Sequence, residues 1–221
     1  MSDSEAVKAP STLLMQFAKW PEAGRVKTRL IPELGEQGAL AAHLQLTTSV
    51  FTQLSATNLT MQFWWDRPVA ETPAAARELV AALSQRAVVQ KTQAGADLGE
   101  RMEDALGRAL TRYDRAIIVG SDCPSVDADY VREAIAAMDH ADVVLGPSDD
   151  GGYVLIGARR VVPAMLTGIQ WGTPEVLAQT CQRLAAAGLT VTQLQPRWDV
   201  DEPADWHRFM AWASADQSTG G

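Results

Sequence analysis

Cationic side chains recur at every second position of a short segment near the N-terminus, at Arg25, Lys27 and Arg29. Together with Lys19 and a single acid, they give residues 19–29 a local net charge of +3, whereas the whole chain has a formal net charge of −8. Lys and Arg side chains are common phosphate ligands. We therefore expect this segment to bind the phosphates of a small ligand, and a solvated charge cluster is the alternative.

Gly24 lies inside this cationic segment and would let the backbone approach a phosphate closely. The segment is not a Walker A loop, because the first glycine of that motif is missing and Lys27 does not directly follow Gly24. No Gly-x-Gly-x-x-Gly motif occurs in the chain, which argues against the usual dinucleotide-binding fold.

Two aspartates are the candidate metal ligands. Asp122 follows the apolar run at residues 116–120, and Asp201 precedes the helix that is predicted to start at Pro203. Mg²⁺ favours a small number of carboxylates together with phosphate oxygens and water. The alternatives are structural: Asp122 would satisfy turn amides, and Asp201 or Glu202 would cap the last helix.

Two glycine-bearing segments are further candidates for the site. Residues 93–102 would form a nucleotide-facing loop, or an ordinary loop in which Asp97 caps the next helix. Residues 149–153 contain Asp150, for which we expect a role as a base or on the acceptor side, but Asp-Gly is also a hairpin signal. Trp171 would stack on a sugar or base, or belong to the core.

Other reactive side chains offer less. Cys123 has no evident partner base and is expected to be a small buried residue. His43, His140 and His207 are not at ligand spacing, so we assign them no role.

The elements that must position these residues alternate between strand and helix. Strands are expected at 12–17, 59–64, 87–90, 116–120, 143–145, 154–156 and 189–194, and helices at 39–54, 73–83, 98–110, 174–187 and 203–212, with another through Val131, Ile135 and Met138. This order predicts an α/β fold, a mostly parallel central sheet covered on both faces. Ligands bind at the carboxyl ends of the strands in such sheets, which is where the candidate segments fall.

Length and composition indicate one domain in 221 residues, at 11–212, with a flexible N-terminus at 1–10 and a flexible tail at 213–221. No apolar run approaches the ~20 residues of a membrane span, and the acidic N-terminus lacks signal-peptide order, so we expect a cytoplasmic protein without a membrane partner. The negative net charge argues against nucleic acid. A homodimer is compatible with the sequence, and Trp64, Trp65 and Trp198 would suit a contact surface or the core.

Six segments in this order resemble the DUF2064 family of the nucleotide-diphospho-sugar transferase (GT-A) superfamily, over roughly residues 12–212. They are Phe17–Leu30, Asp97–Met102, Gly120–Pro124, Asp150–Gly157, Trp171–Thr173 and Asp199–Pro203. The first segment is also similar to that of 2-phospholactate guanylyltransferases, and the wider group includes other nucleotidyltransferases.

The resemblance implies a three-layer α/β/α sandwich, a nucleotide-bound donor and a divalent metal, Mg²⁺ or Mn²⁺, on Asp122 and Asp201. Glu202 stands where a Thr is common in the superfamily, a departure that leaves Asp201 intact. The expected catalytic residues are Asp122, Lys27 and Asp150. The expected nucleotide-binding residues are Lys19, Gly24, Arg25, Lys27, Thr28, Arg29, Asp97, Gly99, Arg101, Gly151 and Gly152.

Two reactions suit these residues. In glycosyl transfer, a small-molecule acceptor attacks the sugar of a nucleotide-diphospho-sugar and a nucleoside diphosphate leaves. In nucleotidyl transfer, a phosphorylated small molecule attacks a nucleoside triphosphate and pyrophosphate leaves. The charge of residues 19–29 favours the second reaction, and the family's labels favour the first, which we place slightly ahead. A nucleotide-sugar binding module without catalysis is a third alternative.

Overall fold

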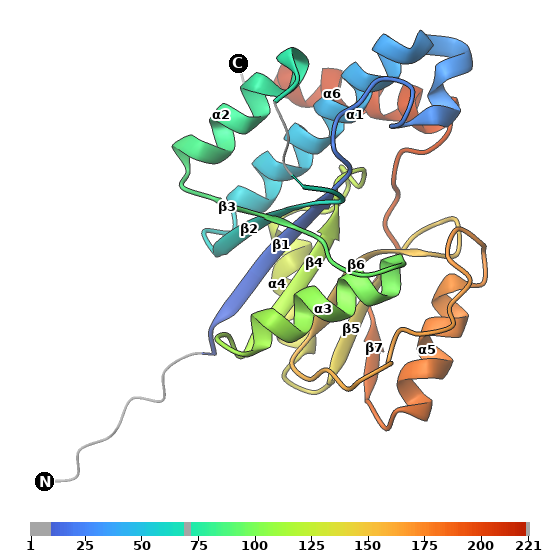
Figure 1. Ribbon diagram of the computed structural model, residues 1–221. Coiled ribbons are helices and arrows are strands. Elements are labelled where there is room, and N and C mark those ends of the chain that lie inside the picture. Colours follow the sequence, from blue (N-terminus) through green and yellow to red (C-terminus); the bar gives the residue numbers. More distant parts are fainter. Residues whose placement is uncertain (1–9, 69–71, 220–221) are drawn as a thin grey trace, which may run out of the picture.

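The computed structural model describes residues 10–68 and 72–219 and contains a seven-stranded sheet flanked by helices (Figure 1). The strands are β1 (Thr12–Ala18), β2 (Thr60–Trp65), β3 (Val89–Thr92), β4 (Arg115–Gly120), β5 (Val143–Pro147), β6 (Tyr153–Ala158) and β7 (Val191–Gln193). The helices are α1 (Ile31–Ser55), α2 (Arg77–Gln85), α3 (Leu98–Leu110), α4 (Ala128–Ala137), α5 (Val176–Ala186) and α6 (Pro203–Thr219), with short 3₁₀ turns η1 (Thr28–Leu30) and η2 (Ala74–Ala76).

The strand order is β3-β2-β1-β4-β6-β5-β7, and β6 runs antiparallel to both of its neighbours while the other pairs are parallel. β5 and β6 form a hairpin, so the Asp-Gly turn signal at residues 149–152 is confirmed. The carboxyl ends of β1, β2, β3 and β4 therefore share one edge of the sheet. Residues that follow these strands are brought together there, although they are far apart in the sequence.

Alternating side chains of β1 divide the core into two layers. Leu13 and Met15 pack with residues of α3 and α5 on one face, and Leu14 packs with residues of α1 and α4 on the other. Side chains alternate between faces in a strand, so this near-continuous apolar sequence is what a strand covered on both faces requires. The predicted three-layer α/β/α arrangement is confirmed. Outside it, α6 packs on α1 through Phe209 and Leu46.

Some predicted boundaries differ from the structure. α1 begins at Ile31 rather than 39, because the helix continues across a kink at Gly35, whose φ of 68° is not helical. β3 begins two residues later than expected, since Ala87 lies in a turn with φ of 52°.

The C-terminal segment and two of the tryptophans can also be compared with the prediction. α6 continues to Thr219 instead of ending at 212, so most of the segment expected to be a flexible tail is helical. Residues 1–9 and 220–221 of the two expected flexible ends lie outside the described residues. Trp64 and Trp65 are core residues, with 1% and 0% of their surface exposed. Among the helices of the described part, none has both the length and the apolar character that crossing a bilayer demands.

Candidate functional site

Lys27 lies between the two aspartates that were predicted to bind metal. Its Nζ donates to Oδ2 of Asp122 at 2.9 Å, to Oδ1 of Asp201 at 3.0 Å, and to the backbone carbonyl of Val200. The three residues come from the segment after β1, the end of β4 and the segment before α6. The structure therefore brings Asp122 and Asp201 within hydrogen-bond distance of one cationic position.

Local backbone structure holds this arrangement. Lys27 adopts a left-handed conformation, with φ of 44°, immediately before η1, and the buried side chains of Val26 and Leu30 anchor the turn on either side of it. The backbone N–H of Val200 donates to the carbonyl of Asp122 at 2.9 Å, which ties the segment before α6 to the end of β4. Only 7% of the Lys27 side chain is exposed, so its ammonium depends on protein acceptors.

The charges around Lys27 shift each other's pKa. Burial lowers the pKa of Lys27, but Asp122 and Asp201 outweigh it and hold that pKa above the usual value. Burial raises the pKa of Asp122, but the Lys27 ammonium outweighs it and lowers that pKa. Asp199 lies on the other side of the cluster, where burial and then the charges of Asp122, Asp150 and Asp201 raise its pKa to about 7. Negative charge is thus in excess even with Lys27 in place.

The donor set fits Mg²⁺ bound together with a nucleotide. No group of three His, Cys, Asp or Glu side chains suited to a metal occurs in residues 10–68 and 72–219, which argues against a closed structural site such as that of zinc. Two carboxylates that approach one cation are what Mg²⁺ uses when phosphate oxygens and water supply its other ligands.

A first cavity of about 420 Å³ opens beside this cluster. Its polar lining comes from the ends of the strands and from the segments that follow them: Lys19, Lys27, Thr28, Arg29, His43, Asp66, Gln93, Arg101, Ser121, Asp122 and Asp201. Four cationic and three acidic side chains therefore face it. Five of the predicted nucleotide-binding residues, Lys19, Lys27, Thr28, Arg29 and Arg101, are among its lining.

The other predicted binders lie outside the first cavity. Arg25 is exposed and pairs with Glu22 at 3.6 Å, and Gly24 precedes it in the same turn. Asp97 caps α3, because its Oδ1 accepts from the N–H of Glu100 at 2.9 Å. Gly99 is needed for packing, since a Cβ there would lie 2.5 Å from the carbonyl oxygen of Leu166.

Internal ion pairs use much of the positive charge of residues 19–29. Arg29 pairs with Asp201 at 3.3 Å and with Glu202 at 3.4 Å, in addition to the pairs of Lys27 and Arg25. Asp201 and Glu202 do not cap α6 with their side chains; instead Asp205 accepts from both of their backbone N–H groups. The local charge that favoured a pyrophosphate leaving group is therefore partly balanced within the protein.

A second cavity, of about 200 Å³, adjoins the first and shares Phe17, Leu98 and Gly120 with it. The polar side chains that line it are Ser148, Asp150, Tyr153, Trp171, Thr173 and Asp199. Asp150 Oδ1 accepts from the N–H of Gly152 at 3.0 Å and from the Ser148 hydroxyl. Trp171 both lines this cavity and packs against the core, with its ring edge-on to Tyr153 at 6.2 Å.

Glycines shape the second cavity. Gly152 lines it, whereas Gly151 adopts φ of 90° at a place where a Cβ would lie 2.2 Å from the carbonyl oxygen of Pro174. Gly151 and Gly152 were predicted to bind the nucleotide, but neither lines the first cavity, which Lys19 and Arg101 line.

Several lining residues had no assigned role in the sequence analysis. Asp66 follows β2, so the rule that ligands bind after strands would have included it. Gln93 follows β3 and is the first residue of the predicted nucleotide-facing loop at 93–102. Asp199 belongs to the same short motif as Asp201. His43 had no sequence signal: its Nε2 is 3.0 Å from the Lys19 carbonyl, and burial lowers its pKa to about 4.

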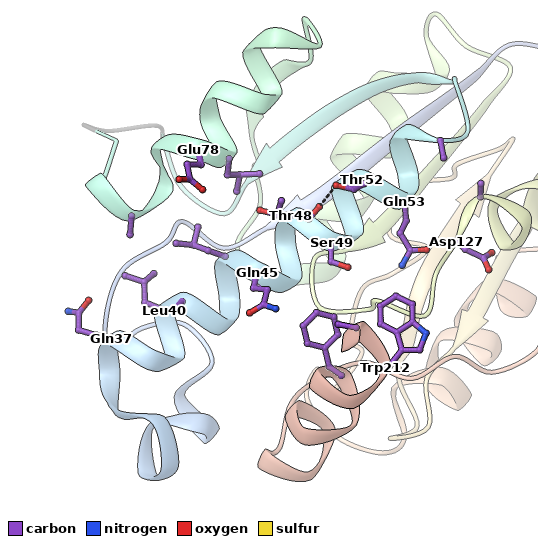
Figure 2. A pocket seen from close by; sticks show the side chains of 18 of the residues that line it. Gln37, Leu40, Gln45, Thr48, Ser49, Thr52, Gln53, Glu78, Asp127 and Trp212 are labelled. Carbon is purple, nitrogen blue, oxygen red and sulfur yellow. Dashed lines mark hydrogen bonds between the residues drawn. The ribbon is translucent and has the colours of Figure 1, made fainter. Parts of the chain in front are cut away.

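A larger cavity, of about 1180 Å³, is a groove along α1 that neither Asp122 nor Asp201 lines (Figure 2). Its walls come from α1, α2 and α6 and from the start of α4, and Figure 2 shows amide and hydroxyl side chains such as Gln45, Thr48 and Gln53 along it. Its charged side chains, Glu78, Asp127 and Asp129, are all acidic, and among the described residues no cation that could bind a phosphate lines it. The candidate site is therefore the smaller pair of cavities at Asp122.

Comparison with known proteins agrees with the fold. Residues 54–173 match a family described as "Uncharacterized protein conserved in bacteria (DUF2064)". The chain belongs to the DUF2064 family. No curated protein matches the sequence. Membership confirms the resemblance inferred from the six segments.

Solved structures of related fold include proteins named as transferases. A provisionally named nucleotide-diphospho-sugar transferase from Desulfovibrio desulfuricans G20 shares 32% identity over 88% of this DUF2064 chain and 84% of its own, with a TM-score of 0.77. A nucleotidyl transferase from Methanothermobacter thermautotrophicus has 15% identity over 91% and 96% of the chains and a TM-score of 0.60. A 4-diphosphocytidyl-2C-methyl-D-erythritol synthase from Anaerococcus prevotii has 9% identity over 93% and 99%, with a TM-score of 0.58. At these lower identities the likeness extends to the fold alone.

Proposed function

We propose that this DUF2064 protein is a Mg²⁺-dependent transferase that moves a glycosyl group from a nucleotide-diphospho-sugar to a small-molecule acceptor. One observation carries the proposal: Asp122 and Asp201 approach a single cationic position at the mouth of a cavity that is also lined by Lys19, Arg29 and Arg101. The 32% identical relative, named for nucleotide-diphospho-sugar transfer, supports the choice of donor.

The position of each residue in the first cavity indicates its role in the proposed reaction. Asp122 and Asp201 would hold the metal, which when bound neutralises charge on the donor's phosphates. Lys19 and Arg101 line the cavity and would bind phosphate oxygens directly, while Arg29 borders the metal position through Asp201. The diphosphate would then lie near Gly120, with its sugar directed toward the second cavity. Positioning and electrostatic stabilisation supply the rate in this arrangement.

The transfer step needs a proton acceptor on the acceptor side. The acceptor's hydroxyl oxygen bonds to the anomeric carbon of the sugar, the bond from that carbon to the diphosphate oxygen breaks, and its electron pair leaves with the nucleoside diphosphate. Asp150, which lines the second cavity, would take the hydroxyl proton. Its ordered carboxylate, bonded to Ser148 and Gly152, is oriented by the β5–β6 turn.

Calorimetry tests the donor assignment. We expect Mg²⁺-dependent binding of one or more nucleotide-diphospho-sugars, and loss of that binding in Asp122→Asn. Asp129→Asn is the matched control, because this carboxylate is 83% exposed, pairs with Arg132 on α4 and lines neither of the two cavities. Donor binding that is insensitive to both Mg²⁺ and Asp122→Asn would refute the metal assignment.

Nucleotidyl transfer is the second candidate, and the four cationic side chains that line the first cavity favour it. It predicts tight binding of nucleoside triphosphates and release of pyrophosphate when a phosphorylated acceptor is present. Glycosyl transfer predicts release of a nucleoside diphosphate instead. Measuring both products in one donor screen separates the two reactions, and binding of a donor without either product would indicate a binding module.

A further inference from the structure

The charged side chains of the second cavity are all acidic. Asp150 and Asp199 line it, and among the described residues no Lys, Arg or His does, whereas the first cavity has four cationic side chains. Phosphate groups are recognised by Arg or Lys, by helix N-termini or by free backbone amides. The second cavity therefore lacks the side chains that an anionic acceptor would need.

Several backbone amides around the cavity already have acceptors within the protein. Two helices, α3 and α5, begin beside the cavity at Leu98 and Val176. At α5 the N–H of Val176 donates to the Thr173 carbonyl and that of Leu177 to the Gly151 carbonyl. At α3 the carboxylate of Asp97 accepts from the N–H of Glu100 and adds a negative charge at this helix end. In the turn between β5 and β6, Gly151 and Gly152 likewise donate to Ser148 and Asp150.

Size and wall chemistry describe the acceptor further. Aromatic rings of Phe17, Tyr153 and Trp171 line the cavity together with aliphatic side chains of β6. Its volume of about 200 Å³ somewhat exceeds the roughly 150 Å³ of an engineered cavity that binds benzene. A single ring therefore fills it, and the carboxylates of Asp150 and Asp199 can accept hydrogen bonds from hydroxyl groups on that ring.

We propose that the acceptor is an uncharged alcohol built on a single ring, and that the second cavity excludes its phosphorylated counterpart. The inference rests on the proposed function, because it identifies the second cavity as the place where the attacking hydroxyl binds. It also distinguishes between the two reactions, since nucleotidyl transfer of the kind considered above requires a phosphorylated acceptor. Like charges brought together at a binding site repel each other, so the two carboxylates would weaken binding of a phosphate ester.

Benzyl alcohol and benzyl phosphate form a matched pair of probes, and saturation-transfer NMR with titration measures their binding to the full-length protein. We expect the alcohol to bind at least about tenfold more tightly than the phosphate ester, which corresponds to ~1.4 kcal/mol. Asp150→Asn combined with Asp199→Asn should narrow this ratio by improving binding of the ester. Asp149→Asn is the control, because Asp149 is exposed, pairs with Arg208 at 3.9 Å and does not line the cavity.

Two results would overturn the proposal: binding of benzyl phosphate as tight as that of the alcohol, or binding of neither probe. An unchanged ratio in the double variant would also contradict it, since the discrimination would then not come from the two carboxylates. Thr173→Lys gives an independent check, because a cation at this lining position should favour the ester while the acids remain. Calorimetry with nucleotide-diphospho-sugars tests the donor separately, so failure of the proposed function is distinguishable from failure of this inference.

Discussion

Replacement of Lys27 by Met tests the central ion cluster most directly. The side chain of Lys27 is 7% exposed, and its ammonium donates to two carboxylates that are 38% and 43% exposed. Breaking a fully buried pair costs 3–5 kcal/mol, and roughly half of that, ~2 kcal/mol, is reasonable for carboxylates that water can reach. In a chain of this length ~2 kcal/mol lowers Tm by about 4–8 °C.

The assay is urea denaturation of wild type and Lys27→Met, with and without Mg²⁺. Without the ion, Asp122 and Asp201 repel each other in the variant, so the full decrease in the free energy of unfolding, ~2 kcal/mol, should appear. With the ion, the variant should regain more stability than the wild type gains, because no ammonium competes for the two carboxylates. Arg108→Met removes an exposed pair with Asp104 at 3.0 Å and should cost no more than ~0.5 kcal/mol.

Two outcomes would refute this reasoning. If Lys27→Met lost no more stability than Arg108→Met, the three bonds of Lys27 would contribute nothing net to the fold. If Mg²⁺ stabilised both proteins equally, the metal would not share its position with the ammonium. The pH dependence gives a further check: the pKa of Asp122 is lowered in the folded protein, so its contribution is present above the ordinary carboxyl pKa and lost in acid. The difference between wild type and variant should therefore shrink in acid.

Three other substitutions test separate features. The pKa of His43 falls from 6.5 to about 4 on folding, so the free energy of unfolding of wild type should decrease by about 2–3 kcal/mol as the pH is lowered from 6.5 to 4. In urea titrations, His43→Gln should show a weaker dependence of this free energy on pH. Gly151→Ala should lower the free energy of unfolding by at least ~2 kcal/mol, since its Cβ would lie 2.2 Å from the Pro174 carbonyl oxygen. The control is Gly107→Ala in α3, whose Cβ meets nothing within 4 Å and which should stabilise the protein by ~0.5–1 kcal/mol. Equal Tm values for the two variants would contradict the turn geometry. Tyr130→Phe removes a 2.7 Å bond to the Gln195 carbonyl and should cost ~1 kcal/mol in thermal unfolding, and an unchanged Tm would mean that water replaces it.

Local signals predicted local structure well. The bounds of α3 agree with the expectation, because Asp97 caps the helix and apolar residues recur at helical spacing behind it. β1 and β4 were recognisable as short apolar runs, typical of strands buried on both faces. α1 was harder, because Pro32 and Gly35 are usual loop residues and the helix tolerates both.

The site was predictable in its parts but not in its connections. The rule that ligands bind after strands identified Asp122; Asp201 was the candidate second carboxylate, with helix capping as the alternative, and the family resemblance favoured the metal role. Their link through Lys27 spans 95 and 174 residues of sequence, and no local pattern encodes it. The Asp-Gly signal indicated the hairpin of β5 and β6, but no local pattern indicated that β6 lies between β4 and β5, the order that accompanies Asp150 lining the second cavity.

The wall shared by the two cavities has a consequence for inhibitor design. Phe17, Leu98 and Gly120 line both cavities, and Gly120 contributes no side chain to this shared lining. A nucleotide fragment and a ring alcohol that each bind weakly can be joined by a short linker that crosses Gly120. Joining them makes the second binding event intramolecular, so the linked compound can exceed either fragment in affinity by orders of magnitude.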